Sequence, residues 1–284
     1  MGRYKKILVT TDGSESSKHV LRESFKLASD DKRWVTVVSV VPHYDGDLGA
    51  TWLSNVHDEV RKPCMVALSE AEDMAKKEGI SVKPVCEEGE IYERIVDLAD
   101  AENADVIIMG RKGMAGLERA LVGSTTARVI GHSQRDVLVV PLGTSVGWKK
   151  VVFATDGSQY SEAATNKAID FAKSYGSELN VISVVDVTEE FIARAPGALD
   201  DLVKKAKGIV EDVKNKAASE GIKAEGVVKE GDAYKNIVDI AEKQKADAII
   251  MGSHGRTGLR RLLMGSVTEK VIGHAPCPIL VVKL

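Results

Sequence analysis

The sequence has few cysteines, and none of them lies in a metal-binding or redox motif. Its 284 residues include only Cys64, Cys86 and Cys277, an odd number with long spacings and no CxxC motif. Disulfide scaffolds and zinc sites depend on closely spaced, usually even sets of cysteines. We therefore expect neither a disulfide scaffold nor a zinc site. A reducing, cytoplasmic location fits this composition better.

Long apolar runs and an excess of positive charge are also missing. No apolar stretch reaches the roughly 18 residues that a membrane-spanning helix needs. The opening MGRYKK passes directly into a strand-like segment and lacks the apolar core of a signal peptide. The formal net charge is -3, so the composition gives no indication of a general basic surface that would bind nucleic acid or an anionic membrane. We accordingly expect neither as a partner.

Several nucleotide-binding and hydrolase motifs are absent. No Gly-Lys dipeptide occurs, which excludes a Walker A phosphate loop, and the glycines after the first predicted strand do not form GxGxxG. The sequence also contains no GxSxG motif, no HExxH motif and no obvious pair of a nucleophile and a base. We assign no catalytic residue.

What the sequence does contain is an internal repeat. Residues 87–110 and 229–252 are identical at 13 of 24 positions, at an offset of 142. Near the start of each copy, TTDGS at 10–14 matches ATDGS at 154–158 at an offset of 144. Self-similarity of this length indicates two copies of one domain.

The copies meet at a short Gly/Ser/Thr segment, residues 143–147, which follows one strand-like run and precedes the next. We expect one domain over residues 1–146 and a second over residues 147–284.

Short β-branched apolar runs alternate with segments of helical spacing in each copy. In the first copy we expect strands at 6–10, 35–41, 82–86, 106–109 and 137–142, and helices at 16–28, about 64–78, 91–101 and about 124–130. Residues 42–63 form a looser stretch. This alternation predicts an α/β fold with two tandem, doubly wound parallel sheets. Ligands of such sheets bind beyond the carboxyl ends of the strands, where the strand order reverses.

A glycine pattern, G-x2-G-x9-G-S, follows the fourth predicted strand of each copy. It comprises Gly110, Gly113, Gly123 and Ser124 in the first copy and Gly252, Gly255, Gly265 and Ser266 in the second. Glycine lets a ligand approach the main chain closely, and the amides at a helix start attract phosphate. Alternatively, Gly110 ends a strand and Ser124 caps a helix. The position at the strand ends favours a ligand.

Charged residues near these glycines have two interpretations. Asp12 and Asp156 either bond the backbone of their own Asp-Gly-Ser turns or present a carboxylate to a base, a ribose or a metal ion. The basic residues of the loops either offset phosphate charge or form a solvated face. These residues are Arg111, Lys112, Arg119, His254, Arg256, Arg260 and Arg261. We assign no chemistry to His132 and His274, which are typical of helix ends.

The chain resembles the universal stress protein family, and in particular its tandem members. The resemblance rests on the TDGS turn, on the doubled glycine pattern and on the closing strands VLVV at 137–140 and PCPILVV at 276–282. It covers essentially the whole chain. The second copy matches the family pattern almost letter for letter in MGSHGRTGLRRLLMGSVTEKVI.

The resemblance implies an adenine-nucleotide alpha-hydrolase-like fold with sheet order 3-2-1-4-5. It also implies ATP as ligand, with or without Mg²⁺, although the residues leave any metal ligands open. The implied contacts in the first copy are Asp12, Val40, Met109, Gly110, Gly113, Gly123, Ser124, Thr125 and Thr126. Those in the second copy are Asp156, Val184, Met251, Gly252, Gly255, Gly265, Ser266, Val267 and Thr268.

The first copy departs from the family pattern at two places. It has Arg111-Lys112 where the family has Ser-His or Ser-Arg, and its approach to the fifth strand is SQRD at 133–136. Because both copies retain the glycine pattern, we predict that both domains bind nucleotide and that the site of the second copy is the stronger candidate. The segments 42–63 and 186–200 differ most between the copies and are expected to tune access to the sites.

The doubled pattern without a catalytic base favours a regulatory ATP-binding stress-response protein, with at most weak ATP hydrolysis. The alternatives are a slow Mg²⁺-dependent ATPase and a nucleotide-independent scaffold for a protein or small-molecule partner. The family also pairs its fifth strands across a two-fold axis. The two copies are expected to pair in that way as an intramolecular pseudo-dimer, and a homodimer of whole chains is also open.

Overall fold

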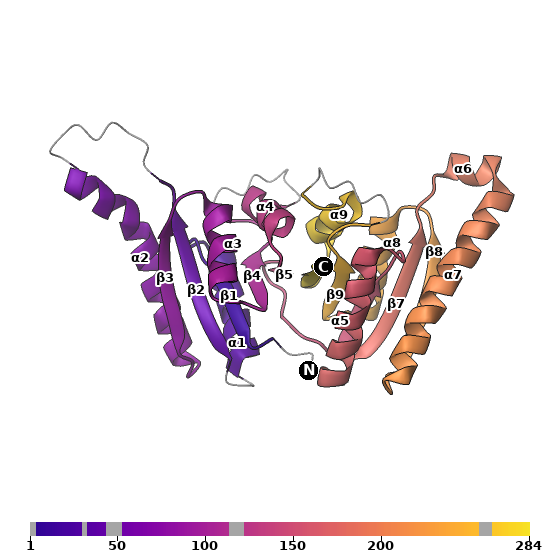
Figure 1. The fold of residues 1–284 in the computed structure, drawn as a ribbon, viewed down its shortest axis with the longest axis horizontal. Helices are drawn as coiled ribbons and strands as arrows, with labels where there is room; N and C mark the ends of the chain where they lie inside the picture. The colour runs from indigo at the N-terminus through magenta and orange to yellow at the C-terminus, as the bar shows by residue number, and fades with distance from the viewer. Residues whose placement is uncertain (1–3, 30–32, 44–52, 114–121, 256–262) are drawn as a thin grey trace. The chain divides into compact units, whose positions relative to one another are not determined.

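Figure 1 shows the computed structural model of the chain, which describes residues 4–29, 33–43, 53–113, 122–255 and 263–284. The contacts divide these residues into two compact units, 4–143 and 144–284, called domain 1 and domain 2 below. Within the described residues, no helix combines the length and the apolar character needed to cross a membrane.

Domain 1 alternates strands and helices, because short β-branched apolar runs are separated by amphipathic segments. In chain order its elements are β1 (Lys6–Thr10), α1 (Glu15–Ser29), β2 (Trp34–Val41), α2 (Leu53–Lys77), β3 (Val82–Glu88), α3 (Ile91–Ala101), β4 (Val106–Gly110), α4 (Ser124–His132) and β5 (Asp136–Val140). The strands pair in the order β3-β2-β1-β4-β5, and the pairs within the domain are parallel.

Domain 2 repeats this architecture with one further short helix after its second strand. Its elements are β6 (Lys150–Ala154), α5 (Gln159–Tyr175), β7 (Glu178–Val185), α6 (Glu189–Arg194), α7 (Pro196–Ser219), β8 (Ala224–Glu230), α8 (Ala233–Gln244), β9 (Ala248–Gly252), α9 (Ser266–His274) and β10 (Ile279–Val282). The order is β8-β7-β6-β9-β10, again parallel. The predicted α/β fold and the 3-2-1-4-5 order are confirmed in both domains.

The strand order of domain 1 reverses between β1 and β4. The chain first moves outward from β1 to β3 and then crosses to β4 on the other side of β1. Helices α1 and α2 pack together, as do α3 and α4, so the two pairs cover opposite faces of the sheet (Figure 1). With both faces covered, every residue of β5 is buried. The carboxyl ends of β1 and β4 therefore lie side by side at the reversal.

The second long helix of domain 1 begins earlier than the sequence suggested. We expected a looser stretch up to residue 63, but α2 already begins at Leu53 and continues through Pro63. A proline inside a helix removes one hydrogen bond and lowers the helical propensity. Packing of α2 on β2 and β3 outweighs that local cost.

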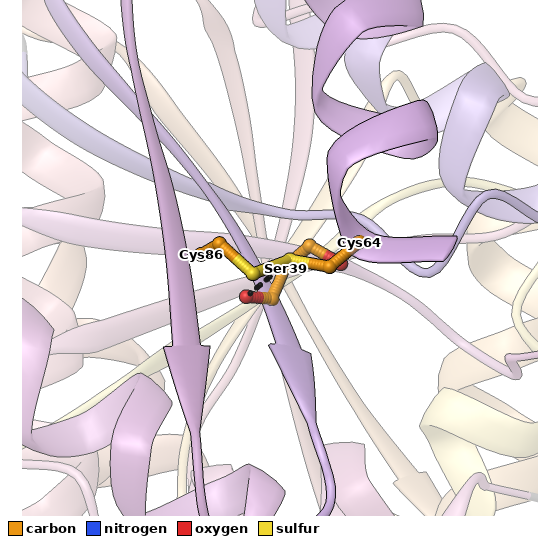
Figure 2. The surroundings of a disulfide bond; sticks show 3 residues. All are labelled: Ser39, Cys64 and Cys86. Atoms are coloured by element: carbon orange, nitrogen blue, oxygen red, sulfur yellow. Dashed lines mark hydrogen bonds between the residues drawn. A yellow bond between two sulfur atoms is a disulfide. The ribbon is translucent and has the colours of Figure 1, made fainter. Parts of the chain in front are cut away.

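The cysteines depart from the sequence-based expectation of no disulfide scaffold, because one pair forms a disulfide. Cys64 of α2 and Cys86 of β3 are joined by a disulfide, with their Cα atoms 6.2 Å apart (Figure 2). The two residues are 22 positions apart in sequence, and only the packing of α2 against β3 brings them together. Cys277 is a free, buried thiol.

Candidate functional site

Domain 2 contains a cavity of about 330 Å³ at the carboxyl ends of β6, β7 and β9. All nine residues of the second copy that we expected to contact a ligand line it, from Asp156 and Val184 to Thr268. The rest of the lining consists of Ala154, Thr155, Ser161, Ile182, Val185, Asp186, Leu202, Ala206, Ala233, Ile237 and His254. The structure thus brings residues from several strands and helices to one hollow at the place where the sheet order reverses.

The turn after β6 places Asp156 in the cavity wall. Gly157 has a φ of 75°, which glycine adopts without strain. Asp156 Oδ1 accepts a hydrogen bond of 3.0 Å from the Ser158 amide. A Cβ at Gly255 would lie only 2.7 Å from Asp156 Oδ2, so the other carboxylate oxygen faces the glycine loop. The first oxygen therefore holds the turn, and the second is the one that could meet a ligand.

Domain 1 repeats the arrangement around Asp12. Its Oδ1 accepts hydrogen bonds from the amide and from the hydroxyl of Ser14, at 3.0 and 2.6 Å. A Cβ at Gly113 would approach Asp12 Oδ2 to 2.5 Å. Because any larger residue at Gly113 would displace the carboxylate, the close contact between this loop and the turn after β1 depends on glycine.

The glycine loop of each domain closes on itself before the next helix. The Gly265 amide donates to Ser253 O at 2.9 Å, and the Gly123 amide donates to Arg111 O at 2.8 Å. Gly123 and Gly265 are the N-cap residues of α4 and α9, and as glycines they supply no side-chain cap. The alternative that Ser124 caps its helix is therefore wrong.

The N-cap glycines of α4 and α9 offer no side-chain oxygen to the first-turn amides, and amides at a helix start favour an anion. Ser124 and Ser266 are the first residues of these helices, and each is exposed to solvent. Their hydroxyls can therefore reach a ligand bound at the helix start.

Two buried threonines attach these helices to the preceding strands. Thr126 Oγ1 donates to Gly110 O at 2.9 Å, and Thr268 Oγ1 donates to Gly252 O at 3.1 Å. Each hydroxyl ties the first turn of the helix to the end of the fourth strand. The sequence presented these threonines as ligand contacts, and the structure gives them a further role, which is to hold the two halves of the glycine pattern together.

The remaining expected residues of domain 1 lie on the same elements as their counterparts. Val40 is on β2, Met109 is buried at the end of β4, and Thr125 follows Ser124 at the start of α4. Arg111 is half-buried, and burial lowers the pKa of its guanidinium, which stays charged at neutral pH.

In domain 2 the position of Lys112 is taken by His254, which lines the cavity. Its ring lies 5.1 Å from that of Tyr160, and its Nδ1 is 3.2 Å from Ser253 Oγ. The other basic residues that the sequence singled out lie outside the described residues: Arg119, Arg256, Arg260 and Arg261.

Sequence reasoning missed the helical wall of the cavity. Leu202 and Ala206 come from α7, and Ala233 and Ile237 come from α8. Their helical spacing is that of ordinary core positions, so no sequence signal separates them from structural residues. Asp186 also lines the cavity and belongs to the segment that we expected near the site mouth.

The described residues contain no cluster of three or more His, Cys, Asp or Glu side chains that could hold a metal ion. The site offers main-chain amides, hydroxyls and single carboxylates. This set of groups suits an anionic ligand better than a resident metal centre.

Comparison with known proteins agrees with the doubled architecture. The model of the universal stress protein family matches residues 3–141 and 147–283. Two universal stress proteins of Methanocaldococcus jannaschii are 43% and 32% identical to this chain over 140 and 157 residues. These matches cover 48% and 49% of this chain and 82% and 97% of the relatives.

Two further proteins match the chain along nearly its whole length. A universal stress protein of Mycolicibacterium smegmatis is 26% identical over 295 residues, covering 98% of this chain and 96% of the relative. The crystal structure of a universal stress protein from Archaeoglobus fulgidus matches 98% of both chains with a TM-score of 0.73 at 22% identity, which shows the shared fold. The chain belongs to the universal stress protein family, as a tandem member with one family domain in each half.

Proposed function

We propose that each domain binds an adenine nucleotide such as ATP and that the protein acts as a nucleotide-dependent regulator in a stress response. The cavity of domain 2 carries this proposal. Around it converge the Asp156 carboxylate, the glycines Gly252, Gly255 and Gly265, and the N-terminus of α9, whose N-cap is Gly265. Ligand cavities commonly have volumes of about 300 Å³ or more and combine an apolar wall with a few polar groups.

The two ends of the cavity differ in chemistry. Ile182, Val185, Leu202 and Ala206 form an apolar wall that suits a purine base. The glycine loop and Ser266 form a polar end, at which the amides of α9 and the helix dipole favour phosphate. Glycine is needed at this end because a side chain would displace Asp156 or keep a ligand away from the main chain.

Domain 1 supports a second, less favoured site. It keeps the Asp12 turn, the loop closure and a glycine, Gly123, at the N-cap of α4. Arg111 and Lys112 replace the Ser253-His254 pair of domain 2, so the loop carries other side chains where the phosphates would lie.

Release of bound nucleotide tests the proposal directly. The purified chain is denatured, and the supernatant is analysed by mass spectrometry for adenine nucleotides. In parallel, the melting temperature of nucleotide-free protein is measured with and without millimolar ATP, which should raise it by mass action. Absence of any released adenine nucleotide together with no thermal shift would contradict the proposal and favour the scaffold alternative.

A charge introduced at the helix start separates binding from folding. Ser266→Asp places an anion at the first position of α9, where the dipole tolerates it, so the fold should be retained. The same charge repels phosphate, and we expect domain 2 to lose roughly tenfold or more in ATP affinity. Ser266→Ala removes the hydroxyl without adding charge and is the matched control, with a much smaller expected loss.

Mg²⁺ fits the same proposal as a companion of the nucleotide. The Asp156 carboxylate and the Ser266 hydroxyl both line the cavity and are oxygen donors of the kind that Mg²⁺ takes together with phosphate oxygens. When bound, the ion would neutralise part of the phosphate charge. If the protein is a slow ATPase, the Mg²⁺-dependent turnover should disappear in Asp156→Asn while nucleotide binding persists.

Two predictions about assembly remain predictions: the pairing of the fifth strands of the two domains, and a homodimer of whole chains.

A further inference from the structure

The Cys64–Cys86 disulfide joins β3 to α2, the counterpart of the helix α7 that lines the cavity of domain 2. Cys64 lies on α2 and Cys86 on β3, which is the outer strand of this domain's sheet order. Cys64 Sγ is 3.4 Å from Ser39 O on β2 (Figure 2). Ser39 directly precedes Val40, the residue expected beside the base. The disulfide therefore lies one residue away from the expected ligand contacts.

The repeat shows what Cys64 corresponds to in domain 2. The helix ends MAKKEGI at 74–80 and KAASEGI at 216–222 align at an offset of 142. The structure supports this alignment, because the Asp-Gly turns of the two domains face Ala67 and Ile209, which are also 142 apart. Cys64 is thus equivalent to Ala206, which lines the cavity of domain 2.

By the same offset, Cys86 is equivalent to Val228. Domain 2 therefore cannot form this cross-link.

Cys64 lies at the point of α2 where the helix starts to be buried. Residues 58–63 are exposed or half-buried, and Cys64, which is 2% exposed, is the first buried residue after them. Pro63 directly precedes it and removes one hydrogen bond of the helix. The covalent bond to β3 thus anchors α2 at the point where its own hydrogen bonding is weakened and its burial begins.

We infer that Cys64 and Cys86 are a redox-sensitive pair that controls how firmly domain 1 retains its nucleotide, while domain 2 is insensitive. The inference rests on the proposed nucleotide binding. In the oxidised form, α2 is held against β3 and the wall beside the base is closed. In the reduced form, the first buried turn of α2 moves more freely, and the nucleotide leaves faster. Rigidity of a binding site in its bound form favours retention of the ligand.

The switch needs only a dithiol reductant. A thiolate of the reductant attacks Cys86 Sγ, which is half-buried and therefore more accessible than Cys64, and the S–S bond breaks so that Cys64 leaves as a thiolate and takes up a proton. The second thiolate of the reductant attacks the mixed disulfide, releasing Cys86 as a thiolate that also takes up a proton. Two electrons pass from the reductant, which ends as a disulfide. A small-molecule disulfide reverses the exchange.

The reduced state keeps a place for the buried sulfur. Ser39 O lies at the distance at which the Cys64 thiol donates a hydrogen bond, so reduction leaves the thiol with an acceptor. The fold is therefore expected to persist in both states, as a reversible switch requires.

Two single-site variants of the full chain make the test specific. Ser266→Asp weakens binding in domain 2, so domain 1 is the remaining strong site. Ser124→Asp weakens binding in domain 1, so domain 2 is the remaining strong site. Each is loaded with a fluorescent ATP analogue in its oxidised form, and the release rate is measured before and after treatment with dithiothreitol. We expect reduction to speed release about fivefold or more in Ser266→Asp and to leave Ser124→Asp unchanged.

Cysteine replacements that copy the residues of domain 2 provide the control. Cys64→Ala and Cys86→Val introduce the side chains found at the equivalent positions there, and in the Ser266→Asp background each should release nucleotide at the fast rate with or without dithiothreitol. Alkylation of the denatured, untreated chain should label one thiol, that of Cys277, and alkylation after reduction should label three.

The possible outcomes distinguish failure of the redox inference from failure of the proposed nucleotide binding. Three labelled thiols before reduction, or equal release rates in both redox states of Ser266→Asp, would overturn the redox inference and leave nucleotide binding intact. Failure of both variants and of the wild-type chain to bind the analogue in either state would instead refute the proposed function.

Discussion

At the residue scale, single side chains combine structural and ligand-directed roles. One oxygen of Asp156 holds its own turn through the Ser158 amide, and the other faces Gly255 in the cavity wall. Thr268 likewise ties α9 to β9 while lining the same cavity. Replacing either residue should affect the shape of the site as well as its contacts, so loss of binding in such variants does not by itself identify a ligand contact.

Cys277 is the residue whose titration gives the clearest prediction. Burial, followed by the nearby Asp247 charge, raises the pKa of the Cys277 thiol to about 12. Alkylation of this thiol in the folded chain should be very slow near pH 8 and should accelerate about tenfold per pH unit up to about pH 12, because only the thiolate reacts. Rapid labelling at about pH 8 without unfolding would contradict this burial.

The same pKa shift makes stability depend on alkaline pH. The thiol titrates at a higher pH in the folded chain than in the unfolded chain. Its contribution is therefore complete below the unfolded pKa of about 9 and is lost as the pH rises towards 12. The loss amounts to at most about 1.4 kcal/mol per pH unit. Denaturation curves from about pH 8 to about pH 11 measure it, and Cys277→Ala should lack this component.

At the scale of elements, the fifth strands of the two domains are approached by different residues, Asp136 in domain 1 and Pro278 in domain 2. In domain 1, β5 begins at buried Asp136, whose carboxylate accepts a hydrogen bond of 2.7 Å from the Tyr4 hydroxyl. In domain 2, Pro278 precedes β10, and its carbonyl accepts from the Ile249 amide at 2.9 Å. The approach to β5 thus places a buried carboxylate at the start of the strand, and the Tyr4 hydroxyl satisfies it.

Removing that hydroxyl should weaken domain 1. Tyr4→Phe keeps the ring but deletes a buried hydrogen bond to a carboxylate, and we expect the free energy of unfolding to fall by about 1–3 kcal/mol. Urea denaturation measures the change. Tyr92→Phe is the control, because its hydroxyl bonds Glu93 at an exposed position and its loss should change stability far less. Equal losses in both variants would contradict the role of the buried bond.

At the scale of the whole molecule, duplication provides two candidate sites that share main-chain geometry and differ in side chains. The loops that follow β4 and β9 close through equivalent hydrogen bonds, and each following helix has glycine as its N-cap residue. Only domain 1 has the cysteine pair and the Arg111-Lys112 loop. One chain therefore combines two homologous sites that need not respond to the same signal.

Titration calorimetry with ATP should count these sites. At ATP concentrations that saturate only the unaltered sites, we expect two nucleotides per wild-type chain, one per chain for Ser124→Asp or Ser266→Asp, and none for the double variant, with the tighter site in domain 2. A stoichiometry of one that disappears in Ser266→Asp and is unchanged in Ser124→Asp would show that domain 1 does not bind, and would contradict the prediction of two competent sites.

The sequence by itself determined the repeat, the parallel α/β architecture and the glycine and aspartate positions around the site. These features follow from the spacing of residues along the chain, because the main-chain geometry of helices and strands fixes which spacings place side chains on one face. Only the tertiary structure decided that Gly123 caps α4, that α2 extends back through Pro63, and that Leu202 lines a cavity. The tertiary structure also showed that Cys64 and Cys86 form a disulfide, because contacts between distant elements depend on how helices pack on the sheet.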